Sequence, residues 1–169
     1  MKYLFLDRDG TIIVNYPYNN NPKFLEIKPG VFEVLRKFQD FDYEIFVVSN
    51  QSAIAKGIST VEDLKNMTNV LDGILKSQGI RISNYFYCQH LNESRCNCRK
   101  PLTGLVDHLF SSKLVNLNQS YMIGDRMSDI EFAKNLKINS ILLSEQKIDS
   151  KSFLSATSWF EIMNIMKIS

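Results

Sequence analysis

The sequence has no long hydrophobic run and almost no excess charge of either sign. None of its apolar stretches approaches the roughly 20 residues that a membrane-spanning helix requires. The charged residues Asp7, Arg8 and Asp9 interrupt the N-terminal region before it could form a signal peptide. The 20 basic and 18 acidic residues leave a net charge of +2, which gives no electrostatic reason to expect a nucleic acid or a membrane surface as a partner. We therefore expect a cytoplasmic protein that binds neither.

Cysteine is scarce, and its three copies all lie within eleven residues. Cys88, Cys96 and Cys98 form an odd-numbered cluster, which is a poor disulfide framework. The pair Cys96-x-Cys98 also lacks the Cys-x-x-Cys spacing that is typical of thiol oxidoreductases. Because His90 lies in the same segment, the cluster is better interpreted as a metal site with four ligands, Cys88, His90, Cys96 and Cys98.

The sequence also lacks internal repeats and low-complexity tracts, and its 169 residues suit a single domain, 1–169, with a sizeable core. Five short apolar segments are typical of buried strands, and segments with helical spacing lie between them. The predicted strands are 3–6, 43–49, 83–88, 120–123 and 140–143, and the predicted helices are 31–39, 60–78, 103–112, 129–136 and 158–166.

This alternation of strands and helices predicts an α/β fold with a doubly wound, Rossmann-like parallel sheet. Right-handed crossovers would place the carboxyl ends of all strands at one edge, where ligands bind in open α/β sheets. Polar residues stand at three of these ends. Asp7 and Asp9 follow the first strand, Ser49 and Asn50 end the second, and Asp125 follows the fourth. We therefore expect one shared site.

The pair Asp7 and Asp9 begins the segment Asp-Arg-Asp-Gly-Thr. Two neighbouring carboxylates repel each other unless a cation or a proton separates them. A plain turn is the alternative, because Asp and Gly favour turns. The partners at the other strand ends favour a site over a turn.

Further carboxylates suggest which cation the site would hold. Asp125 and Asp129 are four residues apart and could face the same side of a helical turn. With Asp7 and Asp9 they would bring up to four carboxylates near one point, and all-oxygen ligation of this kind suits Mg²⁺. For Asp129 a helix cap is the alternative.

Positive charge and hydrogen-bond donors near these acids suit a phosphoryl group. Lys100 precedes a helix on the same side of the predicted sheet, and Ser49 adds a hydroxyl. Backbone N–H groups after Asp9 and Asn50 add further donors. Asp7 could then attack phosphorus and form an aspartyl-phosphate. Asp9 could protonate the leaving oxygen and later activate water.

Four segments resemble, in order, the four motifs of the haloacid dehalogenase superfamily over about residues 2–143. They are Asp7-x-Asp9-Gly10-Thr11, Ser49-Asn50-Gln51, Arg99-Lys100-Pro101 and Gly124-Asp125-Arg126…Asp129. The resemblance implies Asp7 as nucleophile and Asp9 as acid/base. It implies that Ser49 and Lys100 bind the phosphate, and that Mg²⁺ is held by Asp7, the carbonyl of Asp9 and Asp125. Asp129 would have a supporting role.

The cysteine segment narrows this resemblance. Cys88-x-His90…Cys96-x-Cys98 followed by Arg-Lys-Pro is similar to the zinc loop of two phosphatase groups, which act on D,D-heptose 1,7-bisphosphate and on histidinol phosphate. This implies a structural zinc site of the ordinary Cys₃His type in a loop over 88–101. The stretch 50–57 is similar to the heptose group, although Ala53 replaces its usual glycine. The short interval between His90 and Cys96 is similar to the histidinol-phosphate group.

The resemblance leads to a specific functional expectation. No insertion is long enough for a separate cap domain, so the loops 15–29 and 51–60 and the zinc loop would form the mouth of the site. Asn50, Gln51 and Arg99 would contact a small phosphorylated metabolite, whereas Lys56 is either a further contact or a solvated loop residue. We expect a monomeric Mg²⁺-dependent phosphatase that removes the C7 phosphate of D-glycero-D-manno-heptose 1,7-bisphosphate on the way to lipopolysaccharide or another surface glycan. Histidinol-phosphate phosphatase is the alternative, and a non-catalytic, zinc-stabilised binding module is the alternative of a different class.

Overall fold

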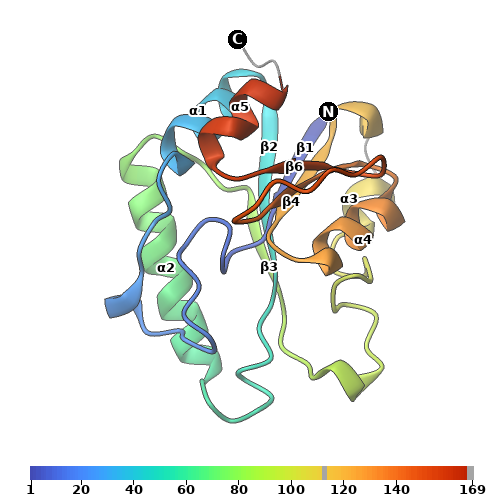
Figure 1. The fold of residues 1–169 in the computed structure, drawn as a ribbon. Helices are drawn as coiled ribbons and strands as arrows, with labels where there is room; N and C mark the ends of the chain where they lie inside the picture. The colour runs from blue at the N-terminus through green and yellow to red at the C-terminus, as the bar shows by residue number, and fades with distance from the viewer. Residues whose placement is uncertain (112–113, 167–169) are drawn as a thin grey trace.

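The computed structural model describes residues 1–111 and 114–166 (Figure 1). Within these ranges the chain forms a six-stranded sheet with the strand order β3-β2-β1-β4-β5-β6, and every pairing is parallel. The predicted doubly wound parallel sheet is therefore confirmed. The strands are β1 (Lys2–Leu6), β2 (Tyr43–Asn50), β3 (Asn84–Cys88), β4 (Tyr121–Gly124), β5 (Asn139–Leu143) and β6 (Leu154–Ala156).

Helices cover both faces of this sheet. The α-helices among the described residues are α1 (Val31–Asp40), α2 (Val61–Ser77), α3 (Asp107–Ser111), α4 (Met127–Leu136) and α5 (Trp159–Met166). Helices α1, α2 and α5 lie on one side, and α3 and α4 lie on the other (Figure 1). Short 3-10 turns, η1 (Pro22–Phe24), η2 (Asn92–Ser94) and η3 (Leu117–Gln119), lie in the connections. No described helix is both long and apolar enough to span a membrane.

Strand β2 is buried on both faces, which explains why its residues 45–48 form an unbroken apolar run. Ile45 and Val47 point into the core beneath α1, α2 and α5, whereas Phe46 and Val48 point into the core beneath α3 and α4. A central strand that is buried on both faces needs apolar side chains at every position. The two cores hold the sheet rigid up to its carboxyl edge, where the polar residues begin.

Helix α2 shows how local sequence signals set the boundaries of an element. Thr60 Oγ1 accepts a hydrogen bond from the backbone N–H of Asp63 at 3.1 Å, and Asp63 Oδ2 accepts one from the N–H of Thr60 at 2.8 Å. This reciprocal capping box satisfies two amides that the first helical turn leaves free. The buried positions of α2 recur at helical spacing: Leu64, Met67, Leu71 and Leu75.

The C-terminal helix supports the loop that follows β1. Trp159, at the start of α5, is 1% exposed. Its Nε1 donates a hydrogen bond of 2.8 Å to the carbonyl oxygen of Thr11. Helix α5 also packs against α1. The end of the described chain therefore fixes the segment that carries the first acidic motif.

One strand and one helix boundary differ clearly from the sequence-based prediction. Strand β6 was not predicted, because its three residues are too few for a periodic pattern and its pairing with β5 decides its conformation. The helix predicted over 103–112 begins only at Asp107, and residue 112 lies outside the described residues. The N–H of Gly104 instead donates to the carbonyl of Asn97 at 3.0 Å, which ties residues 101–106 to the preceding loop. Glycine is also a weak helix former.

Candidate active site

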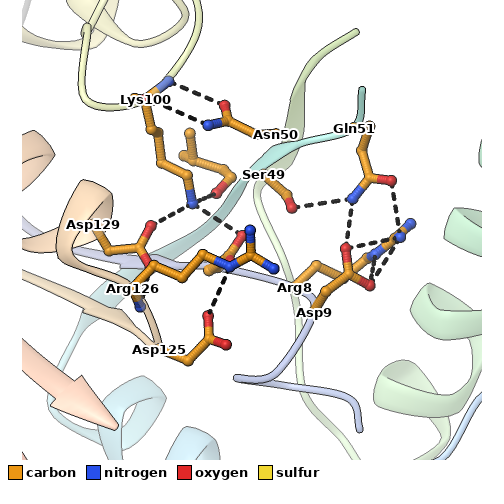
Figure 2. A network of polar contacts seen from close by, with 11 residues as sticks. Arg8, Asp9, Ser49, Asn50, Gln51, Lys100, Asp125, Arg126 and Asp129 are labelled. Carbon is orange, nitrogen blue, oxygen red and sulfur yellow. Dashed lines mark hydrogen bonds and ion pairs between the residues drawn. The ribbon is translucent and has the colours of Figure 1, made fainter. Parts of the chain in front are cut away.

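The carboxyl edge of the sheet gathers the acids that the sequence predicts there (Figure 2). Asp7 follows β1 and Asp125 follows β4, while Asp129 lies in the first turn of α4. One carboxylate oxygen from each of these three lies within 4.8 Å of the others. Because parallel strands end at the same edge, residues more than 100 positions apart meet there.

Lys100 comes to this cluster from the loop after β3. Its Nζ lies 2.9 Å from Asp7 Oδ1 and 2.6 Å from Asp129 Oδ1, and it donates a 2.6 Å hydrogen bond to the carbonyl of Val48. The side chain is 4% exposed. Burial opposes its positive charge, but the carboxylates of Asp129 and Asp7 outweigh that effect and raise the pKa of Lys100. The lysine is therefore a permanent cation between two acids.

The single positive charge of Lys100 cannot neutralise the three carboxylates of the acidic cluster. Burial, followed by the charges of Asp7 and Asp129, raises the pKa of Asp125 to about 7. Asp125 Oδ1 is buried and receives no hydrogen bond from the described part of the chain. A hard divalent cation is the natural partner of such oxygens. Asp7 and Asp125, with Asp129 beside them, could hold one.

Glycine keeps space open around these acids. Gly10 has a φ of +80°, and a Cβ at this position would run into the carboxylate of Asp125. A Cβ on Gly124 would likewise run into Asp129. The motifs therefore need glycine next to the acids for steric reasons as well as for the turn.

Asp129 has the helix-cap role that the sequence left as an alternative, and its supporting role at a metal site stays a prediction. Its Oδ2 accepts a hydrogen bond of 3.0 Å from the backbone N–H of Arg126, which caps α4. Its Oδ1 forms the ion pair with Lys100. Burial raises the pKa of this carboxyl group against the opposing charge of Lys100.

Asp9 does not join the acidic cluster, in contrast to the sequence expectation of four carboxylates near one point. Its carboxylate faces Arg8, whose Nε and Nη2 donate to it at 3.1 and 3.0 Å. Gln51 Nε2 donates to Asp9 Oδ2 at 2.6 Å and to Ser49 Oγ at 3.1 Å. Figure 2 shows this group beside the cluster formed by Lys100 and the other acids.

The predicted substrate contacts Asn50 and Gln51 are engaged by the protein itself. The carboxamide of Asn50 accepts from the N–H of Lys100 at 3.0 Å and donates to its carbonyl at 3.1 Å. Gln51 is 5% exposed and bridges Arg8, Asp9 and Ser49. Both residues therefore hold other site residues in place.

The cysteine loop brings its four predicted ligands together. Cys88 Sγ lies 3.7 Å from His90 Nδ1 and 3.8 Å from Cys96 Sγ, and Cys98 Sγ lies 3.3 Å from Cys88 Sγ and 3.1 Å from His90 Nδ1. Zn–S bonds of about 2.3 Å in a tetrahedron place sulfur atoms about 3.8 Å apart. The donor set and its spacing therefore fit a single closed metal site.

This loop also presents Arg99. Arg99 Nε donates to Asn92 Oδ1 at 2.6 Å, and Nη1 donates to the carbonyl of His90 at 3.1 Å. The guanidinium is fixed on the loop, next to Lys100, and lines the cavities of the site.

Two adjoining cavities share Arg99 as a wall. The inner cavity, about 160 Å³, reaches Asp7, Ser49 and Lys100. The outer cavity, about 360 Å³, opens toward the loops 15–19 and 50–56 and includes Lys56. Both are bordered by Asp9, Asn50, Asn92, Arg99 and Arg126. A ligand could therefore place one end at Asp7 and the rest in the outer cavity.

Sequence reasoning missed several residues of this site. Arg8 lies inside the first motif and is 1% exposed, so its charge next to a buried strand was an available signal. Arg126 lines both cavities from within the fourth motif. Asn20, which accepts from Arg8 Nη2 at 2.8 Å, gave no signal in the sequence. Tyr18 accepts a 2.6 Å hydrogen bond from Lys56 Nζ, which places Lys56 at the mouth.

Comparisons with known proteins agree with the fold and with the resemblance that the sequence motifs indicate. The family profile described as "Polynucleotide kinase 3 phosphatase" matches residues 2–142. A protein of Thermoplasma volcanium named "Probable D-glycero-D-manno-heptose-1,7-bisphosphate 7-phosphatase" is 42% identical over 144 residues, which cover 85% of this chain and 99% of the relative. The D-glycero-beta-D-manno-heptose-1,7-bisphosphate 7-phosphatase of Helicobacter pylori J99 is 31% identical over 169 residues, covering 99% of this chain and 94% of the relative.

A second group of relatives is bifunctional. The histidine biosynthesis bifunctional protein HisB of Blochmanniella floridana is 35% identical over 144 residues, which cover 83% of this chain but 40% of the relative. Among solved structures, the D,D-heptose 1,7-bisphosphate phosphatase of B. bronchiseptica, described as complexed with magnesium and phosphate, has a TM-score of 0.86 at 21% identity. That match covers 99% of this chain and 98% of the other.

Proposed function

Because this chain belongs to the polynucleotide kinase 3 phosphatase family of the haloacid dehalogenase superfamily, we propose that it is a Mg²⁺-dependent phosphatase that hydrolyses the 7-phosphate of D-glycero-D-manno-heptose 1,7-bisphosphate. One observation carries the proposal: Lys100 and Asp7 form a buried ion pair of 2.9 Å at the floor of a polar cavity. A carboxylate nucleophile needs a fixed cation beside it to accept a phosphoryl group.

The first half of the reaction transfers the phosphoryl group to Asp7. A carboxylate oxygen of Asp7 attacks phosphorus, and the bond from phosphorus to the ester oxygen breaks. Asp9 gives the leaving oxygen its proton. Lys100 and the Ser49 hydroxyl balance the charge on the phosphoryl oxygens. The product alcohol then leaves an aspartyl-phosphate at Asp7.

The second half returns the enzyme to its starting state. Asp9, now a carboxylate, takes a proton from a water molecule, and the resulting hydroxide attacks phosphorus. The acyl-phosphate bond breaks, inorganic phosphate leaves, and Asp7 is again a free carboxylate. Mg²⁺ held by Asp7, the carbonyl of Asp9 and Asp125, with Asp129 in support, would add positive charge next to the phosphoryl oxygens.

The loop over 88–101 has a structural role in this proposal. Cys88, His90, Cys96 and Cys98 would hold one Zn²⁺, and the closed Cys₃His set would leave no open position for catalysis. The ion would instead fix the loop that carries Arg99 and Lys100.

The charge of the outer cavity favours a bisphosphate. Lys56, Arg99 and Arg126 face it from three different segments, and Glu93 lies on its rim. The other two charged lining residues, Arg8 and Asp9, are paired with each other. A second phosphate on the substrate would find complementary charge there, whereas the ammonium group of histidinol phosphate would be repelled. Although the family name refers to polynucleotides, the net charge of +2 does not support a nucleic-acid substrate. The proposed substrate is therefore a small metabolite. We further propose that residues 1–169 form a single, monomeric domain that acts in the cytoplasm.

Histidinol phosphate is the second candidate, because the bifunctional HisB relatives are 35–36% identical to this chain. Release of inorganic phosphate should be measured with heptose 1,7-bisphosphate, histidinol phosphate and a 3′-phosphorylated oligonucleotide. We expect the highest kcat/KM for the heptose bisphosphate and no turnover by Asp7→Asn. A preference for either of the other two esters would contradict the proposed substrate. Equal background rates for wild type and Asp7→Asn on all three would favour a binding module.

A further inference from the structure

Arg8 is a buried cation that is hydrogen-bonded to Asp9, Asn20 and Gln51, and its guanidinium carbon lies 5.9 Å from the centre of the Tyr87 ring. It is 1% exposed, although it stands between the two acids of the first motif. Its Nε and Nη2 grip both oxygens of Asp9 at 3.1 and 3.0 Å. A fork of two parallel hydrogen bonds fixes the plane of a carboxylate as well as its position. Arg8 therefore decides which way Asp9 points.

The same guanidinium connects Asp9 to both loops at the mouth. The two hydrogens of Arg8 Nη2 are shared among three acceptors, because Nη2 also lies 2.8 Å from Asn20 Oδ1 and 3.0 Å from Gln51 Oε1. Asn20 belongs to the loop after the first motif, and Gln51 begins the loop after β2. The two loops are joined directly as well, because Asn20 Nδ2 donates to Ser59 Oγ at 3.1 Å. Asp9, Arg8 and the loops thus form one continuous hydrogen-bonded unit, of which Figure 2 shows Arg8, Asp9 and Gln51.

Stability alone does not account for this arrangement. Taking a guanidinium out of water costs several kcal/mol, and a buried ion pair often contributes no more than an apolar replacement would. Asp9 keeps 20% of its side chain exposed and borders both cavities. Its partner is thus a fully buried cation, while Asp9 itself faces the space where a leaving group would lie. The ion pair also keeps Asp9 out of the cluster of Asp7, Asp125 and Asp129.

We propose that Arg8 is a positioning residue that aims Asp9 at the leaving-group oxygen and, through Asn20 and Gln51, makes this aim depend on the placement of the two mouth loops. The inference rests on the proposed phosphatase function. It gives the middle residue of the Asp7-Arg8-Asp9 segment a role in proton transfer, in addition to its place in the buried interior.

The test compares esters whose leaving groups differ in their need for a proton. The alkyl ester is the 7-phosphate of heptose 1,7-bisphosphate, whose leaving oxygen must be protonated, whereas 2,4-dinitrophenolate leaves unaided. The parameter is kcat/KM, because it reports the phosphoryl transfer to Asp7 and not the later hydrolysis. We expect Arg8→Met to lower kcat/KM for the alkyl ester about 100-fold, as general acid catalysis typically contributes. The value for dinitrophenyl phosphate should change less than about threefold, since it needs no acid.

Matched variants separate positioning from folding. Arg36→Met removes an exposed arginine on α1 and should change neither ester. Arg8→Met in an Asp9→Asn background should add nothing to the loss from Asp9→Asn, because both changes remove one function. Asn20→Ala leaves Arg8 in place and should lower the alkyl rate about tenfold while sparing the dinitrophenyl rate. If Arg8→Met does not fold, this variant decides the question.

The outcomes distinguish a failure of the proposed phosphatase function from a failure of the role assigned to Arg8. If the wild type hydrolyses neither ester, the proposed function and this inference both fall. If the wild type is active but Arg8→Met and Asn20→Ala slow both esters equally, the phosphatase stands and Arg8 only supports the fold.

Discussion

The side chain of Asn50 holds Lys100 through the backbone N–H and carbonyl of the lysine, and not through its ammonium group. The Asn50 carboxamide accepts from the Lys100 N–H at 3.0 Å and donates to the Lys100 carbonyl at 3.1 Å. The end of β2 is in this way bound to the end of the cysteine loop, which arrives from 50 residues further along the chain. The backbone of Lys100, and with it the position of the proposed catalytic ammonium, is thus held by an amide that the sequence analysis predicts as a substrate contact.

Replacing Asn50 should loosen this attachment. Asn50→Ala leaves the N–H and carbonyl of Lys100 without partners, which we expect to cost about 1–3 kcal/mol of unfolding free energy. The kcat should fall while the KM changes little, because Lys100 loses its position and not its contact with substrate. Denaturant unfolding and steady-state kinetics check this, with Asn69→Ala on the exposed face of α2 as the control. A large rise in KM at constant kcat would return Asn50 to the role of substrate contact.

The two histidines of the chain offer a matched test of the zinc site. His90 lies in the Cys₃His cluster, whereas His108 packs on the ring of Phe86 at 5.7 Å. We expect about one zinc per chain in the wild type and in His108→Ala, and a clear loss in His90→Ala. Elemental analysis and thiol titration before and after a chelator would measure this. Equal zinc contents in both variants would contradict the assignment of His90 as a ligand.

Magnesium should stabilise the protein more at high pH than at low pH. The pKa of Asp125 is raised to about 7, above its value of about 4 in an unfolded chain. In the metal-free protein its favourable contribution is therefore complete below pH 4 and is lost as the pH rises through 7. In the proposed function Mg²⁺ takes the place of that proton, so the increase in Tm on adding Mg²⁺ should grow from pH 5.5 to pH 8. At 100-fold excess over Kd the gain in unfolding free energy should approach about 2–3 kcal/mol.

Thermal melts with and without Mg²⁺ at both pH values measure this effect. Asp125→Asn should remove most of the increase, whereas Asp40→Asn, on the exposed side of α1, should retain it. An increase that does not depend on pH would show that Asp125 does not exchange a proton for the metal.

Lys56 should discriminate between substrates with one and two phosphates. Its Nζ lies 4.2 Å from the centre of the Tyr18 ring and borders the outer cavity. Lys56→Met should raise the KM for heptose 1,7-bisphosphate about three- to tenfold, as expected for one charge-assisted contact. It should leave the KM for an alkyl monophosphate unchanged. Lys65→Met, on the exposed face of α2, is the control. An equal effect on both substrates would mean that Lys56 supports the mouth without reading the second phosphate.

The sheet and the acidic cluster could be predicted from sequence for one physical reason. Apolar strands that end in Asp7, Ser49 and Asp125 leave little freedom once the strands are parallel, because their carboxyl ends then share one edge. The four proposed ligands of the cysteine loop could be predicted equally well, because they lie close together in the sequence. These predictions needed only patterns within single segments.

The orientation of individual polar groups could not be predicted in this way. Asp9 turns toward Arg8 because Asn20 and Gln51, from two separate loops, hold the guanidinium in place. An asparagine or glutamine can equally serve a substrate, a backbone or another side chain. Which of these it meets depends on loop placement that no periodic pattern encodes. Strand β6 could not be predicted for a related reason, because its conformation depends on its pairing with β5.

The hydrogen bond from Trp159 to Thr11 bears on where the functional unit can be cut. Family similarity extends over residues 2–142, and a fragment designed from it would omit β6 and α5. Such a fragment would contain Asp7, Asp125, Asp129, Lys100 and the four predicted metal ligands, yet the carbonyl of Thr11 would lose its donor and α1 would lose the helix that packs against it. The end of the family profile and the end of the structural support for the first motif therefore do not coincide in this chain, and truncation or domain grafting should retain β6 and α5.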